Sequence, residues 1–233
     1  MLIVCEHASR HVPDRYGDLG LGKEALSSHI AWDIGALDLA RDIARRLGAP
    51  LINARVSRLV YDLNRPPEVS AAIPDRSEIY DIPANRNLDA TARAERVETT
   101  YRPWREALAQ AIRDSGARAL ITVHSFTPVY FGERRETTVG ILHDRDLRLA
   151  DIVLEEAGEQ GREWDRNSPY GPEDGVTHTV RIAEDAGLLP LMIEVRNDLL
   201  ATPVDIASQG ASITQVLLPA LDRAGVAIAE AQS

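Results

Sequence analysis

The sequence predicts an α/β fold: a single domain with a mostly parallel or mixed central sheet and helices on both faces. Short apolar runs typical of buried strands alternate along the chain with segments of helical periodicity. Three of these runs, at 2–5, 119–123 and 189–193, are followed directly by histidine or glutamate. Open α/β sheets have their sites at the carboxyl ends of the strands, so these side chains are expected to converge. We expect residues 1–233 to form one domain, because no internal repeat divides them.

The N-terminal half contains two predicted strands, two helices and a long polar segment. Strands are expected at 2–5 and 51–54, where the residues are mostly apolar. The segment 33–48 has apolar residues at helical spacing and ends at a glycine, as helices often do. The polar segment at about 65–88 is too long for a simple connection, so we expect it to serve the function. A long helix is expected at about 91–115.

The C-terminal half continues the alternation. Strands are expected at 119–124, 138–142 and 189–193. Helices are expected at 145–158, at 177–186 and from 202 onwards. A turn-rich loop is expected at 161–175. The last helix has the clearest start. Thr202 can cap its N-terminus, Pro203 suits the first helical position, and Asp205 completes the pattern.

Composition limits the partners of the chain. The formal net charge of −10 argues against nucleic acid and anionic membranes, since both require a basic surface. A small anionic substrate would have to be held by local arginines. One cysteine cannot form an internal disulfide, and neither a signal peptide nor a membrane span is recognisable, so a cytoplasmic location is expected. The sequence leaves the oligomeric state open.

His7, Asp33 and His124 are the residues expected to bind a metal. The two histidines follow separate predicted strands, and Asp33 opens the first predicted helix. Two imidazoles, a carboxylate and an open position form a common catalytic zinc site, although other divalent metals accept the same ligand types. The simpler alternatives are structural histidines and a carboxylate that only caps the helix. His29, one turn before Asp33, is a competing ligand. Residues expected to support the site are Glu6, His29 and Ser125.

Glu194 is expected to be the catalytic base. It follows the apolar run at 189–193, where a carboxylate inside the sheet would be costly. At the strand end, next to a metal or a cation, the same group is tolerable. There it could take a proton from water and pass it to a leaving amine. The alternative is a structural ion pair between Glu194 and Arg196.

A second set of residues is expected to hold the carboxylates of the substrate: Arg58, Asn64, Arg65 and Arg196. Arginine suits bidentate recognition of carboxylates, and several of these residues lie close in sequence to the proposed chemistry. Surface charge is the simpler interpretation for any one arginine. Cys5, inside an apolar run, is expected to be a small buried residue rather than a nucleophile.

Five segments of this chain occur in the same order in a known family, and they are spread over nearly the whole sequence. They lie at 6–9, 29–36, 57–66, 123–128 and 194–199. Together they resemble the N-formylglutamate amidohydrolase family. The resemblance implies a metal-dependent amide hydrolase with a zinc-exopeptidase-like (phosphorylase/hydrolase-like) α/β fold. It also implies zinc, or another divalent metal, as the cofactor.

Wider relatives bear on the metal ligands. Zinc-dependent muramoyl-alanine amidases surround their zinc with residues similar to His7, Asp33 and His124. The His-x-x-Glu ligand pair of zinc carboxypeptidases is missing here, because Arg10 follows His7 at that spacing. The acidic ligand is therefore expected to be Asp33, with Glu6 as the alternative.

The resemblance implies that the chain hydrolyses an N-acyl amide of an acidic amino acid. The example is N-formyl-L-glutamate, which yields L-glutamate and formate in histidine catabolism. Two alternatives remain: a metallopeptidase or cell-wall amidase-like hydrolase, and a non-catalytic binding protein for acidic amino-acid derivatives.

Overall fold

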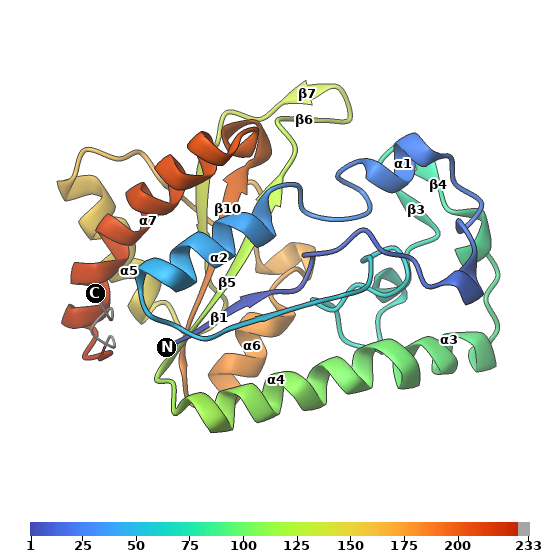
Figure 1. The fold of residues 1–233 in the computed structure, drawn as a ribbon, viewed down its shortest axis with the longest axis horizontal. Coiled ribbons are helices and arrows are strands. Elements are labelled where there is room, and N and C mark those ends of the chain that lie inside the picture. Colours follow the sequence, from blue (N-terminus) through green and yellow to red (C-terminus); the bar gives the residue numbers. More distant parts are fainter. Residues whose placement is uncertain (228–233) are drawn as a thin grey trace.

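The computed structural model describes residues 1–227, and residues 228–233 of the expected domain lie outside the described part. Its centre is a sheet with the strand order β2-β1-β5-β10-β8-β9 (Figure 1). The strands are β2 (Leu51–Asn53), β1 (Leu2–Cys5), β5 (Ala119–Phe126), β10 (Leu189–Arg196), β8 (Val139–Leu142) and β9 (Asp165–Arg166). All neighbours are parallel except β10 and β8, which are antiparallel. The prediction of an α/β fold with a mostly parallel or mixed sheet is confirmed.

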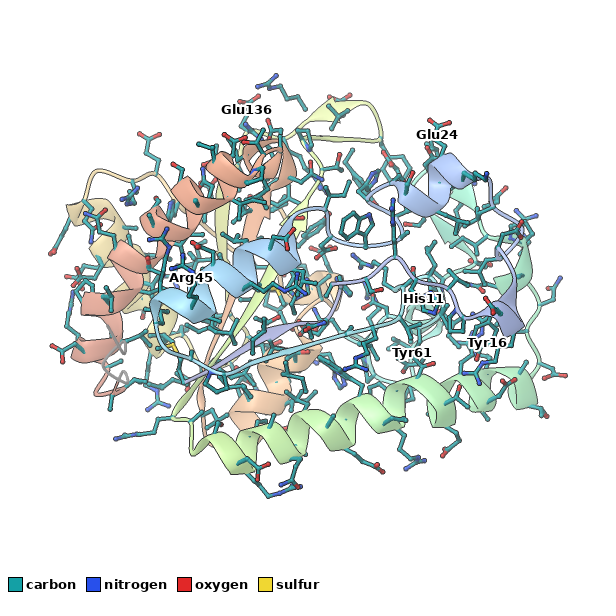
Figure 2. All side chains as sticks on the ribbon, in the orientation of Figure 1. His11, Tyr16, Glu24, Arg45, Tyr61 and Glu136 are labelled. Atoms are coloured by element: carbon teal, nitrogen blue, oxygen red, sulfur yellow. The ribbon has the colours of Figure 1, made fainter. Side chains whose placement is uncertain are left out.

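Helices cover both faces of the sheet (Figure 1). On one face lie α2, α5 and α7, and on the other lie α4 and α6. These helices are α2 (Ala36–Arg46), α5 (Arg148–Glu159), α7 (Pro203–Arg223), α4 (Arg102–Ser115) and α6 (His178–Asp185). Successive side chains of a strand point to opposite faces, so Ile3 and Cys5 pack under α2 and α7, whereas Leu2 and Val4 pack toward α4. Tyr61 joins the core beside α4 (Figure 2). No helix in the described part of the chain is long and apolar enough to cross a membrane.

The helix expected to open at Asp33 begins instead at Ala36, with Gly35 in the N-cap position. Gly35 has a φ of 80°, and a Cβ atom there would lie 2.6 Å from Leu200 Cβ, so this position requires glycine. Asp33 lies in the turn before the helix, and no side-chain hydrogen bond caps α2. The capping alternative for Asp33 is therefore wrong, and its carboxylate is available to the site.

Two hairpins extend the sheet region at the carboxyl ends of the strands. The first hairpin lies in the polar segment at 65–88, beside α1 (Lys23–Ser27), and consists of β3 (Arg76–Ser77) and β4 (Tyr80–Asp81) (Figure 1). The second hairpin follows β5 and consists of β6 (Val129–Tyr130) and β7 (Glu133–Arg134). The hairpins meet where Glu78 Oε1 accepts a hydrogen bond of 2.8 Å from the Phe131 amide. The expectation that the long polar segment serves the site is consistent with this position, although the segment is not structureless.

The helix expected at 91–115 is interrupted. A turn of π-helix at Val97–Tyr101 joins α3 (Ala90–Arg96) to α4. Such turns often occur where a side chain has a specific task. Here the hydroxyl of Tyr101 lies 2.8 Å from Nε2 of His178 on α6, so the interruption links the two helices on this face of the sheet.

The stability of the fold is expected to depend on the protonation of His178. Burial, aided by the charge of Arg105, lowers the pKa of His178 to about 4 from 6.5. Between these values the unfolded chain binds more protons at this site than the folded chain, so stability falls as pH decreases through this range. Between about pH 7.5 and about pH 4.5 the wild type should lose about 2 kcal/mol more unfolding free energy than His178→Gln, because glutamine does not bind a proton. Urea unfolding at the two pH values measures this, and equal losses in both proteins would contradict it.

Candidate active site

His7, Asp33 and His124 meet at the carboxyl end of the parallel strands. His7 follows β1, Asp33 precedes α2, and His124 lies within β5, which continues past it to Phe126. His124 Nδ1 lies 2.8 Å from Asp33 Oδ2 and 3.2 Å from His7 Nδ1, and His7 Nδ1 lies 3.3 Å from Asp33 Oδ2. The Ser125 amide donates to the same Asp33 oxygen over 3.3 Å. All three predicted ligands are buried, and their ligand atoms surround one point.

The other nitrogen of each imidazole faces a carboxylate. His7 Nε2 lies 2.7 Å from Asp62 Oδ1, and His124 Nε2 lies 3.1 Å from Glu6 Oε2. The Thr122 hydroxyl also donates to Glu6. Carboxylates in this position fix the tautomer and the orientation of metal-binding histidines. The structure thus places Glu6 behind His124 and outside the group of converging ligand atoms, where it supports the site instead of completing it.

The spacing of the three ligand atoms is close to that of the ligands of a tetrahedral zinc ion. Ligands about 2.0–2.1 Å from zinc at tetrahedral angles lie roughly 3.3 Å from one another. The distances among His7 Nδ1, Asp33 Oδ2 and His124 Nδ1 are 2.8–3.3 Å. Two imidazoles and one carboxylate beside a cavity fit the donor set of a catalytic zinc site, and these three residues would hold the ion.

The carboxylates around the two imidazoles are held in their ionised form. Burial alone would raise their pKa values, but their neighbours outweigh burial. The His7 imidazole keeps the pKa of Asp33 well below its usual range, and the Arg58 guanidinium does the same for Asp62. Hydrogen bonds and the adjacent imidazole lower the pKa of Glu6 to about 2. The same carboxylates raise the pKa values of the His7 and His124 imidazoles, and Arg58 pairs with Asp33 and Asp62, so these positively charged groups balance the buried carboxylates.

Glu194 faces this cluster from β10. It is the register partner of His124 on β5, so the two side chains lie on the same face of the sheet. Glu194 is 5% exposed, and its Oε2 atom has no hydrogen-bond partner among residues 1–227. Burial raises its pKa to about 7. A buried carboxylate without a partner, beside a cluster of candidate metal ligands, is suited to proton transfer.

Arg196 does not reach the site, and this corrects the expectation that it holds a substrate carboxylate. Its Nε donates to Asp198 over 2.9 Å, and its Nη1 donates to the carbonyls of Arg135 and Glu136 over 3.0 and 3.2 Å. Glu136 lies at the edge of the molecule near β7 (Figure 2). Arg196 does not line the cavity, and no ion pair joins it to Glu194 in the described residues, so that alternative is also wrong. It fixes the loop between β7 and β8.

Arg58 and Arg65 line the cavity, as expected for substrate-binding residues. Arg58 donates to Asp33 Oδ1 over 3.2 Å and to Asp62 Oδ2 over 2.9 Å. Arg65 donates to two backbone carbonyls of the 174–175 turn, and its Nε lies 3.4 Å from Asp62. Arg58 is thus shared by two carboxylates, whereas Arg65 bonds mainly to neutral groups and has more capacity for an anionic substrate.

Asn64 and His29 have structural contacts. Asn64 borders the cavity, but its amide group bonds to backbone groups within 176–179. It therefore holds this segment against the 62–65 region. His29 Nε2 lies 2.9 Å from Glu78 Oε2, so the structure does not bring His29 into the cluster of His7, Asp33 and His124.

The ligand cluster and Glu194 line a cavity of about 390 Å³. This volume suits a small-molecule substrate. The β3–β4 hairpin contributes Glu78 to its wall, β6 contributes Tyr130, and the loop before α6 contributes Tyr170. The two hairpins described above therefore border the cavity on the side away from the sheet.

Sequence reasoning missed Asp62 and Tyr170. Asp62 lies inside the buried run Leu59–Leu63, and a carboxylate among buried residues signals a specific partner. That signal was present in the sequence. Tyr170 lies in a turn-rich loop, and nothing in the local sequence connects it with Glu194.

The chain is similar to known proteins over most of its length. Residues 1–201 match the family model described as N-formylglutamate amidohydrolase. The gene product Atu2144 from Agrobacterium tumefaciens has a sequence 47% identical to this chain. Its crystal structure superposes on this one with a TM-score of 0.93, over 96% of this chain and 91% of that chain.

An N-formylglutamate amidohydrolase from Ralstonia eutropha JMP134 shares the fold, with 22% identity and a TM-score of 0.67 over 96% of this chain and 94% of that chain. No curated protein matches the chain. The family match covers most of the sequence, and it includes every residue of the cluster around His7, Asp33 and His124. The chain therefore belongs to the N-formylglutamate amidohydrolase family and is an amidohydrolase.

Proposed function

We propose that the protein is a metal-dependent amidohydrolase that removes an N-acyl group from an acidic amino acid, with N-formyl-L-glutamate as the leading substrate. The observation that supports this most directly is the unpartnered Glu194 carboxylate facing the cluster of His7, Asp33 and His124. The family model and the name of the Ralstonia protein support the choice of acyl group and amino acid. Given the net charge of −10, we also propose a small anionic substrate, no nucleic-acid or membrane partner, and a cytoplasmic setting.

The residues divide the reaction among them. His7, Asp33 and His124 would hold a zinc ion, which when bound polarises the scissile carbonyl and lowers the pKa of water. Glu194 accepts a proton from the attacking water. At the same time the water oxygen bonds to the formyl carbon, and the π electrons of the carbonyl group move to the carbonyl oxygen. When the tetrahedral intermediate collapses, the C–N bond breaks and Glu194 returns the proton to the departing nitrogen. The products are formate and free L-glutamate.

A substrate panel tests this proposal. The metal-loaded protein would be assayed with N-formyl and N-acetyl derivatives of glutamate, aspartate and leucine, with short peptides and with muramoyl peptides. We expect the highest kcat/KM for N-formyl-L-glutamate. Faster cleavage of peptides or muramoyl peptides would favour the metallopeptidase or cell-wall amidase alternative. Tight binding of an acidic derivative that remains intact would favour the binding protein.

Arg65 is expected to bind a substrate carboxylate. Truncating one partner of a buried, hydrogen-bonded charge pair costs about 2–5 kcal/mol, so Arg65→Ala should lower kcat/KM by roughly 30- to 1,000-fold or more. Arg65→Lys should recover only part of this loss, since lysine lacks the planar fork of donors. Steady-state kinetics on N-formyl-L-glutamate measure the effect, with the exposed Arg113→Ala on α4 as the control. A normal kcat/KM in Arg65→Ala would remove Arg65 from substrate binding.

A further inference from the structure

We propose that the Tyr170 hydroxyl donates a hydrogen bond to the oxygen of the scissile carbonyl as that oxygen gains negative charge, and that Arg135 positions Tyr170 for this task. The inference rests on the proposed function, because it assigns a residue to the same hydrolysis. Tyr170 and Glu194 line the same cavity as the His7–Asp33–His124 cluster.

The loop that contains Tyr170 is pressed against the sheet beside Glu194. Gly140 on β8 is the register partner of Glu194 on β10. A Cβ atom at Gly140 would lie 1.8 Å from the Ser168 carbonyl oxygen, so only glycine allows the loop to pass this close to the sheet. Tyr170 lies two residues after this close approach, and it lines the same cavity as Glu194.

Polar contacts hold this loop in place. The Asn167 amide donates to the Ile141 carbonyl over 3.0 Å, and Asn167 Oδ1 accepts from the His143 amide over 3.0 Å. The hydroxyls of Ser168 and Thr137 lie 2.7 Å apart. The loop is therefore anchored to both ends of β8, and the position of the phenol is set before any substrate arrives. Such preorganisation is what makes a hydrogen-bond donor effective in a transition state.

The Tyr170 ring contacts both an apolar surface and a guanidinium. Its apolar neighbours are Leu142, Val180 and Met192. The Arg135 guanidinium carbon lies 4.7 Å from the centre of the Tyr170 ring and 4.4 Å from the centre of the Tyr130 ring. Arg196 fixes the backbone of Arg135 through its carbonyl. The structural role found for Arg196 thus extends to the cavity through Arg135 and Tyr170.

The Tyr170 phenol is suited to act as a donor that keeps its proton. Burial, together with the negative charge of Glu194, raises the pKa of Tyr170 to about 12. At neutral pH the hydroxyl therefore remains protonated, and it can stabilise a developing oxyanion without transferring a proton. Glu194 alone then moves the proton from water to the leaving nitrogen, so the two residues have separate tasks.

Tyr170→Phe tests the proposal, because phenylalanine retains the ring and its packing but lacks the hydroxyl. With whichever N-acyl amino acid or peptide the wild type cleaves, we expect kcat to fall by roughly 10- to 1,000-fold. KM should stay within about threefold and the metal content should not change. Affinity for a tetrahedral phosphonamidate analogue of the substrate, measured by calorimetry, should fall by a similar factor, whereas affinity for L-glutamate should not. Tyr80→Phe, a partly buried tyrosine outside the cavity, is the matched control.

A double-mutant cycle tests the role of Arg135. Arg135→Ala should lower kcat in the wild-type background but have little further effect in Tyr170→Phe, because a positioning residue acts through the group that it positions. Full additivity would overturn the assignment of Arg135.

The failure of this inference can be told apart from failure of the proposed function. A wild type that hydrolyses its substrate, with unchanged kcat and analogue affinity in Tyr170→Phe, would overturn only the role of Tyr170. A rise in KM alone would also overturn it, since the hydroxyl would then bind the ground state. A wild type that neither cleaves an amide nor binds the analogue would overturn both proposals.

Discussion

Replacing Glu194 with glutamine is expected to lower kcat by about 10²- to 10⁴-fold, because glutamine has nearly the same shape but cannot accept a proton. KM should change little, and the metal content should not change. Within residues 1–227 Glu194 forms no ion pair, so the substitution leaves no buried cation without a partner. The variant should therefore fold, and its unfolding free energy should equal or exceed that of the wild type, since a buried carboxylate has been replaced by a neutral amide. Steady-state kinetics and thermal unfolding measure the two effects.

Glu156→Gln is the matched control. Glu156 is also buried, but it lies on α5, on the opposite face of the sheet from the cavity, and its carboxylate pairs with Arg223 over 2.6 Å. Here the same substitution should reduce stability and leave kcat unchanged. If Glu194→Gln kept near wild-type turnover, Glu194 would have to be removed from the mechanism, and the unpartnered carboxylate would need another explanation.

The sequence predicts the part of the site that depends on strand ends. His7 and His124 follow or lie within buried parallel strands, and Glu194 is the register partner of His124. The carboxyl ends of parallel strands meet at one edge of the sheet, so identifying the strands is enough to bring these residues together. The convergence of His7, His124 and Glu194 could therefore be predicted from apolar runs and residue types, whereas their roles in metal binding and proton transfer stay predictions.

The parts that could not be predicted depend on loop geometry. Arg196 follows Glu194 closely in sequence, but its guanidinium is directed to backbone carbonyls of a loop whose path no local pattern reveals. The position of Tyr170 depends on a close approach between Gly140 and Ser168, two segments that are distant in sequence. Asp33 reaches the cluster because Gly35 delays the helix start, an effect that helical periodicity does not detect. Side-chain direction in loops follows from tertiary contacts, whereas residue type alone only suggests a role.

Removing the metal is expected to abolish activity and to reduce stability. Freshly purified protein should hold about one zinc or similar divalent ion per chain, and chelation should remove it together with the hydrolysis. A metal ion that binds only the folded chain stabilises it by mass action, so its removal lowers the unfolding free energy even though Arg58 still pairs with Asp33 and Asp62. Unfolding free energy should increase by about 3 kcal/mol when free metal is added at roughly 100 times its Kd.

Ligand variants locate the metal within the cluster. His7→Ala and His124→Ala should each lose most of the bound metal, because each removes one of three protein ligands, and the double variant should hold none. His29→Ala should keep it, since His29 contacts Glu78 and lies outside the cluster. This comparison also tests His29, which the sequence left as a competing ligand. Retention of metal by the double variant, or full amidohydrolase activity in the chelated wild type, would show that the His7–Asp33–His124 cluster is a hydrogen-bonded network with no metal, and Glu194 would then need another partner to activate water.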